Sequence, residues 1–86
     1  MIYGITFTDD ADEDLSRLDN TVKETVINRL KWLAENAELV NHRRLTGRWA
    51  GFYRLRAGDY RALYTIDREN HRIVVEAIGH RSDVYR

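Results

Sequence analysis

The sequence predicts an α+β fold in which a helical hairpin packs on one face of an antiparallel sheet, in the element order β-α-α-β-β-β. Apolar residues recur at helical spacing through the first half of the chain. Short β-branched and aromatic runs, separated by turn residues, fill the second half. A chain of 86 residues has room for one hydrophobic core, so residues 1–86 are expected to form a single domain.

The first half of the chain predicts one strand followed by two helices. Residues 2–7 are a short β-branched and aromatic run, typical of a strand. Thr8 is expected to cap the first helix, because acidic side chains follow it and negative charge stabilises a helix N-terminus. Asp19 and Asn20 end that helix and offer a cap for the second. Trp32 lies off the apolar stripe of the second helix and is expected at the edge of the core. That stripe consists of Val22, Val26, Leu30, Leu33 and Ala37.

The second half predicts three strands that follow a basic connector. Residues 39–50 form this connector, which is expected to run as a loop. Residues 51–64 predict two strands joined by a tight turn at Ala57-Gly58-Asp59, where glycine can adopt the positive φ that such a turn requires. Residues 73–78 are the most apolar run and are expected near the centre of the sheet.

The formal net charge of zero conceals a division between the two halves of the chain. Residues 1–41 carry nine acidic and four basic side chains, whereas residues 42–86 carry ten arginines, no lysine and five acidic side chains. The guanidinium group is planar and forms bidentate contacts with phosphate. The second half therefore predicts a face that binds a polyanion.

Several function classes lack their sequence requirements here. The chain has no cysteine, and its three histidines show no metal-ligand spacing, so no metal site is expected. Neither a phosphate-binding glycine loop nor a nucleophilic serine motif is present, and no small-molecule cofactor is expected. With no apolar run of about 20 residues and no signal-peptide pattern, the expected location is the cytoplasm, away from membranes.

Basic, imidazole and phenol groups are expected to converge near the central hairpin. Strand alternation puts Arg54 and Arg56 on one face, and Arg61 is expected to join them from across the turn. Such groups suit the attack of a ribose 2′-hydroxyl on its own 3′-phosphate, because cations stabilise the developing charge and protonatable groups move protons. The candidate catalytic residues are Arg54, Arg56, Arg61, His80, Arg81 and Tyr85.

Three further arginines lie in the basic connector. Arg43, Arg44 and Arg48 either line the same cleft, as RNA- or ribosome-binding residues, or keep the loop hydrated. Both readings stay open at this stage, because the conformation of a loop does not follow from its composition.

This pattern resembles the RelE branch of the RelE/ParE toxin superfamily of bacterial toxin–antitoxin systems. The resemblance is carried by Leu45-x-Gly47, by the segment 53–64, and by Gly79-His80-Arg81-x-x-x-Tyr85. It implies a microbial-RNase-like fold that enters the ribosomal A site and cleaves mRNA. It also implies that a cognate antitoxin protein binds and neutralises the toxin.

The resemblance further implies roles for individual residues. Arg54 and Arg56 match paired basic residues that contact mRNA, and Arg61 matches an arginine that stabilises phosphate charge, as does Arg81. Tyr85 matches a C-terminal tyrosine that stacks on or orients the substrate, and His80 matches a basic residue of some relatives. Well-studied members often carry lysines at the first pair. Arginine cannot act as a base near neutral pH, which leaves His80 or Tyr85 as the proton-transfer candidate.

Two other functions remain open. The ParE branch shares the fold and the antitoxin, but its members act on DNA gyrase and do not cut mRNA. A non-catalytic module that binds RNA or a protein partner would use the same arginines, but it would not need His80 or Tyr85.

Overall fold

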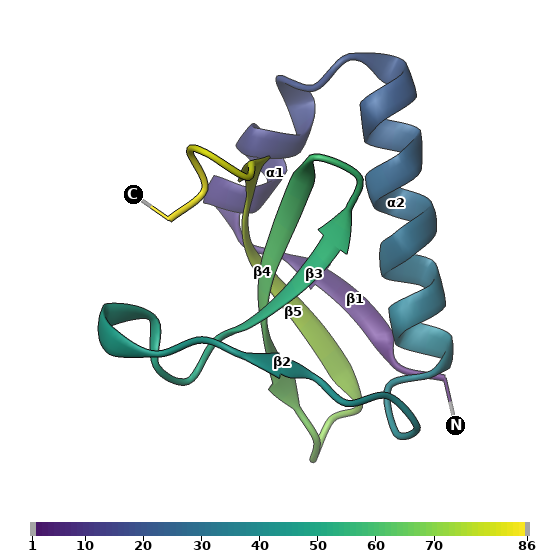
Figure 1. The fold of residues 1–86 in the computed structure, drawn as a ribbon. Helices are drawn as coiled ribbons and strands as arrows, with labels where there is room; N and C mark the ends of the chain where they lie inside the picture. Colours follow the sequence, from purple (N-terminus) through teal and green to yellow (C-terminus); the bar gives the residue numbers. More distant parts are fainter. Residues whose placement is uncertain (1, 86) are drawn as a thin grey trace.

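The computed structural model describes residues 2–85, which form two helices, a 3₁₀ turn and a five-stranded sheet (Figure 1). The strands lie in the order β1-β5-β4-β3-β2. No helix in this part of the chain is both long and apolar enough to cross a membrane. The elements are β1 (Gly4–Phe7), α1 (Asp9–Ser16), α2 (Asn20–Glu35), β2 (Arg43–Arg44), η1 (Gly47–Trp49), β3 (Tyr53–Ala57), β4 (Tyr60–Asp67) and β5 (Arg72–His80).

The two helices begin where the sequence predicts. The Thr8 hydroxyl accepts a hydrogen bond of 3.2 Å from the Ala11 backbone N–H, and the Asp19 carboxylate accepts one of 3.0 Å from Val22 N–H. Each cap satisfies a backbone donor that the first turn of a helix leaves free. The predicted first strand is two residues shorter at its start than expected, because pairing with β5 begins at Gly4.

The sheet is mixed, and this corrects the expected antiparallel arrangement. Strands β2 to β5 pair antiparallel, but β1 pairs parallel with β5, from Gly4↔Arg72 to Phe7↔Val75. The β1-to-α1 connection and the β3-β4-β5 meander each fix strand directions locally. The sequence pattern of β1 does not specify which edge of the sheet this strand joins. Because it joins the edge formed by β5, it runs parallel to its neighbour. The prediction also missed β2, which lies within the segment expected as a loop.

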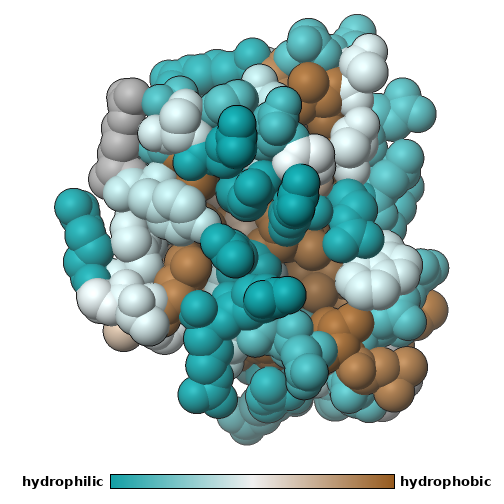
Figure 2. Space-filling view, in the orientation of Figure 1, coloured by the Kyte–Doolittle hydropathy of each residue, from teal (hydrophilic) through white to brown (hydrophobic). Residues whose placement is uncertain are grey.

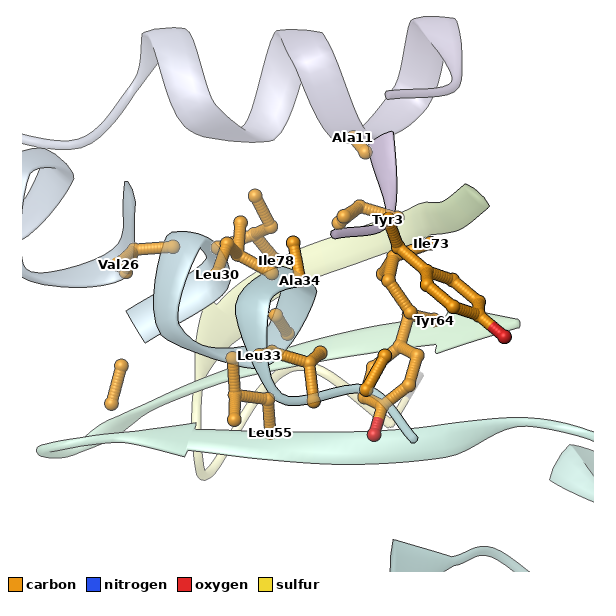
Figure 3. Close-up of a cluster of buried hydrophobic side chains, with 14 residues drawn as sticks. Tyr3, Ala11, Val26, Leu30, Leu33, Ala34, Leu55, Tyr64, Ile73 and Ile78 are labelled. Atoms are coloured by element: carbon orange, nitrogen blue, oxygen red, sulfur yellow. The ribbon is translucent and has the colours of Figure 1, made fainter. Parts of the chain in front are cut away.

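The hydrophobic core lies between α2 and the sheet. Leu30 and Leu33 are 0% and 1% exposed and point from α2 toward the sheet, where Leu55 and Ile73 are also buried (Figure 3). These contacts confirm the predicted apolar stripe, which continues past the helix end to the buried Ala37. Trp32 remains 41% exposed, as expected for a residue off the stripe.

Side chains from the two helices form hydrogen bonds with strand backbone groups where a long strand extends beyond the strand next to it. Strand β5 continues beyond β1, and there the Ile78 N–H donates a 3.0 Å hydrogen bond to the Asp14 carboxylate of α1. Strand β3 continues beyond β2, and there the Arg56 carbonyl accepts a 3.2 Å hydrogen bond from Arg29 Nε of α2. Each helix therefore closes part of one edge of the sheet.

Candidate nucleic-acid interface

The β3–β4 hairpin gives its two faces opposite character. Gly58 opens the two-residue turn with φ of 61°, a conformation that favours glycine. Leu55 is buried against α2, whereas Arg54 and Arg56 are exposed on the opposite face. The alternation predicted for this strand is therefore observed, and it directs basic side chains away from the core.

We call the sheet face that carries Arg54 and Arg56 the open face. Four arginines meet on it and form what we call the arginine cluster: Arg43, Arg54, Arg56 and Arg61. Arg56 lies directly opposite Arg61 in the β3–β4 ladder, and Arg43 lies directly opposite Arg54 in the β2–β3 ladder. Together the four side chains line a cavity of about 200 Å³. Hydrophilic side chains gather over the middle of the face on which β3 and β4 lie (Figure 2).

The arrangement of the arginine cluster opposes folding unless an anion is bound. Like charges directly opposite one another in a ladder repel, and the cluster contains two such pairs. A polyanion would relieve this repulsion and would receive several charge-assisted hydrogen bonds at once. The geometry is therefore suited to binding phosphate or carboxylate groups.

Arg61 is held in place by the turn that it follows. Its Nη1 donates hydrogen bonds of 2.9 Å to the carbonyls of both Gly58 and Tyr60. These bonds fix the plane of the guanidinium group in the absence of ligand, so less side-chain entropy remains to be lost when an anion binds.

Arg81 lies at the same turn but is held differently. Its backbone N–H donates a 2.8 Å hydrogen bond to the Asp59 carbonyl, and its Nε lies 3.9 Å from the Asp59 carboxylate. Both side chains are largely exposed, so this ion pair is weak and a bound phosphate can displace Asp59. The structure thus brings Arg61 and Arg81 to one turn of the hairpin.

His80 lies apart from the arginine cluster. It pairs with Tyr60, one residue before Arg61, so its side chain emerges on the other face of the sheet. Its ring contacts Tyr60 edge-on at 5.5 Å. Nδ1 accepts a 3.2 Å hydrogen bond from Ser82 N–H and lies 2.8 Å from the Ser82 hydroxyl. Nδ1 is thus occupied by Ser82, and a neutral ring in this arrangement carries its proton on Nε2.

Tyr85 is also not free to act on a substrate in this arrangement. Its hydroxyl is buried and has no hydrogen-bond partner among residues 2–85, and its carbonyl accepts a 3.4 Å hydrogen bond from the Trp49 indole. A role on substrate would therefore require the tail to move. The tail after β5 consists of turns, which makes such a movement less costly than for a paired strand.

The three connector arginines occupy different positions. Arg43 belongs to the arginine cluster, because β2 pairs with β3. Arg44 pairs with Tyr53 and therefore emerges on the other face of the sheet from Arg43. The guanidinium group of Arg48 lies 5.9 Å from the ring centre of Trp49, within η1.

A second cavity of about 220 Å³ continues from the arginine cluster around the edge of β3. We call it the α2–β3 groove. It shares three arginines with the cluster and adds an apolar floor, with Arg29 stacked 4.7 Å from the ring centre of the exposed Trp32. The sequence did not single out Arg29, since its position on α2 gives no sign that it reaches β3. The groove is lined by Arg29, Trp32, Leu33, Val40, Asn41, Arg43, Arg54, Leu55, Arg56 and Tyr64.

An imidazole–phenol contact beneath β2 was also not predictable from the sequence. His42 Nδ1 lies 2.6 Å from the Tyr64 hydroxyl, and His42 Nε2 lies 2.7 Å from the Ala37 carbonyl. Burial raises the pKa of the Tyr64 hydroxyl well above its usual value, and the nearby Tyr53 raises it further. Tyr64 therefore remains a neutral donor at every pH at which such a protein works.

A larger cavity, of about 680 Å³, lies between α1, β5 and Trp49 and has the opposite charge. Its lining includes the carboxylates of Asp14, Glu76 and Asp83, so it does not suit phosphate. Across residues 2–85, no group of three histidine or acidic side chains is placed to hold a metal ion.

Known proteins are similar to this chain in sequence and in fold. Residues 5–85 match the family described as ParE toxin of type II toxin-antitoxin system, parDE. The chain is 33% identical over 86 residues to Toxin RelG of Mycobacterium tuberculosis, a match that spans 100% of this chain and 99% of the relative.

Solved structures agree with these matches. The toxin–antitoxin complex RelBE2 from Mycobacterium tuberculosis contains a chain similar to this one, with a TM-score of 0.84 and 31% identity over 96% of this chain and 95% of that chain. The intact E. coli RelBE toxin–antitoxin complex gives a TM-score of 0.74 and 25% identity over 91% and 95%. The predicted α+β fold class and the predicted resemblance are both confirmed. This chain belongs to the RelE/ParE superfamily, as a RelE-type toxin of a type II toxin–antitoxin system.

Proposed function

We propose that this protein is an mRNA endoribonuclease that cleaves in the ribosomal A site without a metal ion. The observation that supports this most is the arginine cluster, in which two pairs of guanidinium groups face one another around a cavity of about 200 Å³. Such a site binds the phosphate backbone of a single strand. Arg61, fixed by two carbonyls at 2.9 Å, is the group best placed to act on a transition state.

The proposed reaction is an attack of the ribose 2′-oxygen on the adjacent phosphorus. The bond from the 2′-oxygen to phosphorus forms and the bond to the 5′-oxygen breaks, which gives a 2′,3′-cyclic phosphate and a 5′-hydroxyl. The 2′-hydroxyl loses a proton, and the leaving 5′-oxygen gains one. Arg61 and Arg81 would stabilise the negative charge that grows on the phosphate oxygens, while Arg54 and Arg56 grip the flanking backbone.

The positions of the proton-transfer candidates support dependence on the ribosome. His80 lies on the far face of the sheet from Arg61, and the Tyr85 hydroxyl is buried. The free toxin therefore holds cations in place without a general base beside them. Alignment of the 2′-hydroxyl with the scissile bond would then come from the ribosome-bound mRNA, and alignment alone can supply a large part of a rate enhancement.

We expect the purified protein to cut mRNA on programmed ribosomes and to leave the same RNA intact in solution. Activity should be unchanged when the free divalent metal is lowered to the minimum that keeps ribosomes assembled, or when Mg²⁺ is replaced by Ca²⁺. Mapping of 5′ ends and phosphatase sensitivity of the products would identify the cleavage site and the cyclic phosphate.

The triple variant Arg54→Ala/Arg56→Ala/Arg61→Ala is the matched control, since it removes three of the four charges of the cluster. Cleavage by this variant at the rate of the wild type would contradict the proposed site. Equal cleavage of free and ribosome-bound RNA would contradict the dependence on the ribosome.

We also propose that a cognate antitoxin covers the arginine cluster and the α2–β3 groove. The cluster supplies positive charge, and the groove floor supplies apolar surface through Leu33, Val40 and Leu55. An acidic segment that carries apolar side chains complements both. The similar chains in the RelBE2 and RelBE complexes, which are toxin–antitoxin complexes, support a partner of this class.

We expect Arg56→Glu to weaken antitoxin binding by at least about tenfold, or about 1.4 kcal/mol, because it places a negative charge between the cluster and the groove. Arg68→Glu makes the same change of charge in the exposed β4–β5 turn and should have little effect. Calorimetry with the antitoxin, taken as the protein encoded next to the gene for this chain, would measure the binding affinity of both variants. Equal effects of the two substitutions would mean that the antitoxin responds only to net charge and does not cover this face.

Inhibition of DNA gyrase is the second candidate function, and the family match supports it, since that family is named for ParE toxins. A supercoiling assay with purified gyrase separates the two activities. Gyrase-linked DNA breaks with no change in mRNA would assign the chain to the ParE branch. Ribosome binding without either effect would indicate a non-catalytic binding module.

A further inference from the structure

Strand β2 is too short to hold its own position. It contains two residues, Arg43 and Arg44, and pairs only with Tyr53 and Arg54 of β3. One more backbone hydrogen bond, 3.0 Å from Leu45 N–H to the Phe52 carbonyl, follows it. Paired strands of this length are marginal without side-chain support. Arg43 nevertheless lines the cavity of the arginine cluster, so another contact must fix the segment.

The side chain of His42 makes that contact. A carbonyl can only accept, so His42 Nε2–H donates the 2.7 Å hydrogen bond to the Ala37 carbonyl, and Nδ1 accepts the 2.6 Å hydrogen bond from the Tyr64 hydroxyl. The imidazole also contacts the rings of Tyr53 and Tyr64 edge-on, at 5.6 and 5.7 Å. Both ring nitrogens are thus engaged, and two tyrosine rings pack against the imidazole.

These contacts tie the start of β2 to the central strand of the sheet. Tyr64 lies on β4 and is 1% exposed, so its hydroxyl is a fixed point. Ala37 is buried just beyond α2, so its carbonyl is a second fixed point. With His42 anchored on the core face, strand alternation directs the next side chain, Arg43, to the open face opposite Arg54.

We propose that His42 is a positioning residue that holds Arg43 in the arginine cluster. The proposal rests on the proposed function, because it gives Arg43 a role in RNA binding. His42 is half-buried and faces the core, so it acts through Arg43 and does not touch the RNA. Without it, β2 would separate from β3 and the cluster would lose one of its four cations.

The first test is a double-mutant cycle for binding of a short single-stranded RNA. Loss of one phosphate contact lowers the affinity about fivefold at 0.1 M salt and reduces the salt slope by about 0.7. We expect this change for His42→Ala and for Arg43→Ala. We expect no further change when both are combined, because the two substitutions remove the same contact. Additive losses would overturn the proposal.

The second test does not require RNA. Amide hydrogen exchange reports the Leu45 N–H bond to Phe52 directly, and we expect His42→Ala to lower its protection at least tenfold while amides of the β4–β5 ladder are unchanged. Unchanged protection at Leu45 would overturn the proposal. If the wild type binds no RNA, the proposed function fails, but this measurement still decides whether His42 holds β2.

Tyr64→Phe is the milder variant, in case His42→Ala does not fold. It removes the donor to Nδ1 and leaves the bond to Ala37, so we expect a smaller loss of Leu45 protection in the same direction. Tyr60→Phe removes a hydroxyl from the other end of β4 and is the matched control. Equal loss of Leu45 protection in the two variants would mean that the effect is general loosening of the sheet, and it would overturn the role of His42.

Discussion

Arg61→Ala is expected to lower the single-turnover rate of mRNA cleavage by about 10²–10³-fold, with little change in ribosome binding. The substitution removes a guanidinium group that two carbonyls hold at 2.9 Å before substrate arrives. Loss of one such preorganised donor typically costs about 2.7–4 kcal/mol of transition-state stabilisation. The measurement is the cleavage rate at saturating toxin, alongside the affinity for programmed ribosomes.

Two further substitutions separate charge from geometry. Arg61→Lys keeps the charge but not the planar group, so it should recover only part of the rate. Arg81→Ala should lower the rate by a similar order, since Arg81 flanks the same turn. Arg44, which emerges on the opposite face, is the comparison: its loss should weaken binding slightly and less so at high salt. An Arg61→Ala protein that cleaves at the wild-type rate once bound would reduce Arg61 to a backbone contact.

Stability should fall steeply above pH 10, and Tyr64 should account for a defined part of the fall. Burial raises the pKa of the folded Tyr64 hydroxyl well above its usual value, while in the unfolded chain it ionises near pH 10. Above pH 10 the unfolded state loses a proton that the folded state keeps. The free energy of unfolding therefore falls by about 1.4 kcal/mol per pH unit from this group.

Tyr64→Phe isolates this contribution, since it keeps the ring in the core. At pH 8 the variant should be less stable by about 1 kcal/mol, because it lacks the hydrogen bond to His42. That difference should shrink above pH 10 and reverse sign near about pH 11, as the wild type loses the stability described above. Urea unfolding at a series of pH values measures both curves. Parallel curves for the two proteins would mean that Tyr64 ionises as easily in the folded as in the unfolded state.

Elements with a strong local signal were predictable from the sequence. The caps at Thr8 and Asp19 predict the starts of the two helices, and the turn at Gly58 predicts the hairpin. Alternation along β3 then predicts that Arg54 and Arg56 share a face, because period-two patterns hold wherever one face is buried. These features depend on residues close together in the chain.

Features that depend on distant residues were not predictable. The parallel pairing of β1 with β5 joins Gly4 to Arg72, and no local pattern encodes it. A two-residue strand has no detectable period, so the sequence left open whether Arg43 lines the same cleft as Arg54 and Arg56. His80 was expected beside Arg61, yet the register Tyr60↔His80 puts it on the other face, because a shift of one residue along a strand reverses the side chain.

The two side chains that cover part of the sheet edges bear on how copies of this protein behave toward one another. The Asp14 carboxylate accepts a hydrogen bond from the N–H of Ile78, and the Arg29 guanidinium donates one to the carbonyl of Arg56. An acidic side chain thus satisfies a strand donor, and a basic side chain satisfies a strand acceptor. A molecule of zero net charge has little long-range repulsion to keep its copies apart. Unpaired strand edges are where copies would join into larger aggregates. In this neutral chain Asp14 and Arg29 therefore contribute local protection of the strand edges, where a highly charged protein would rely on its overall field.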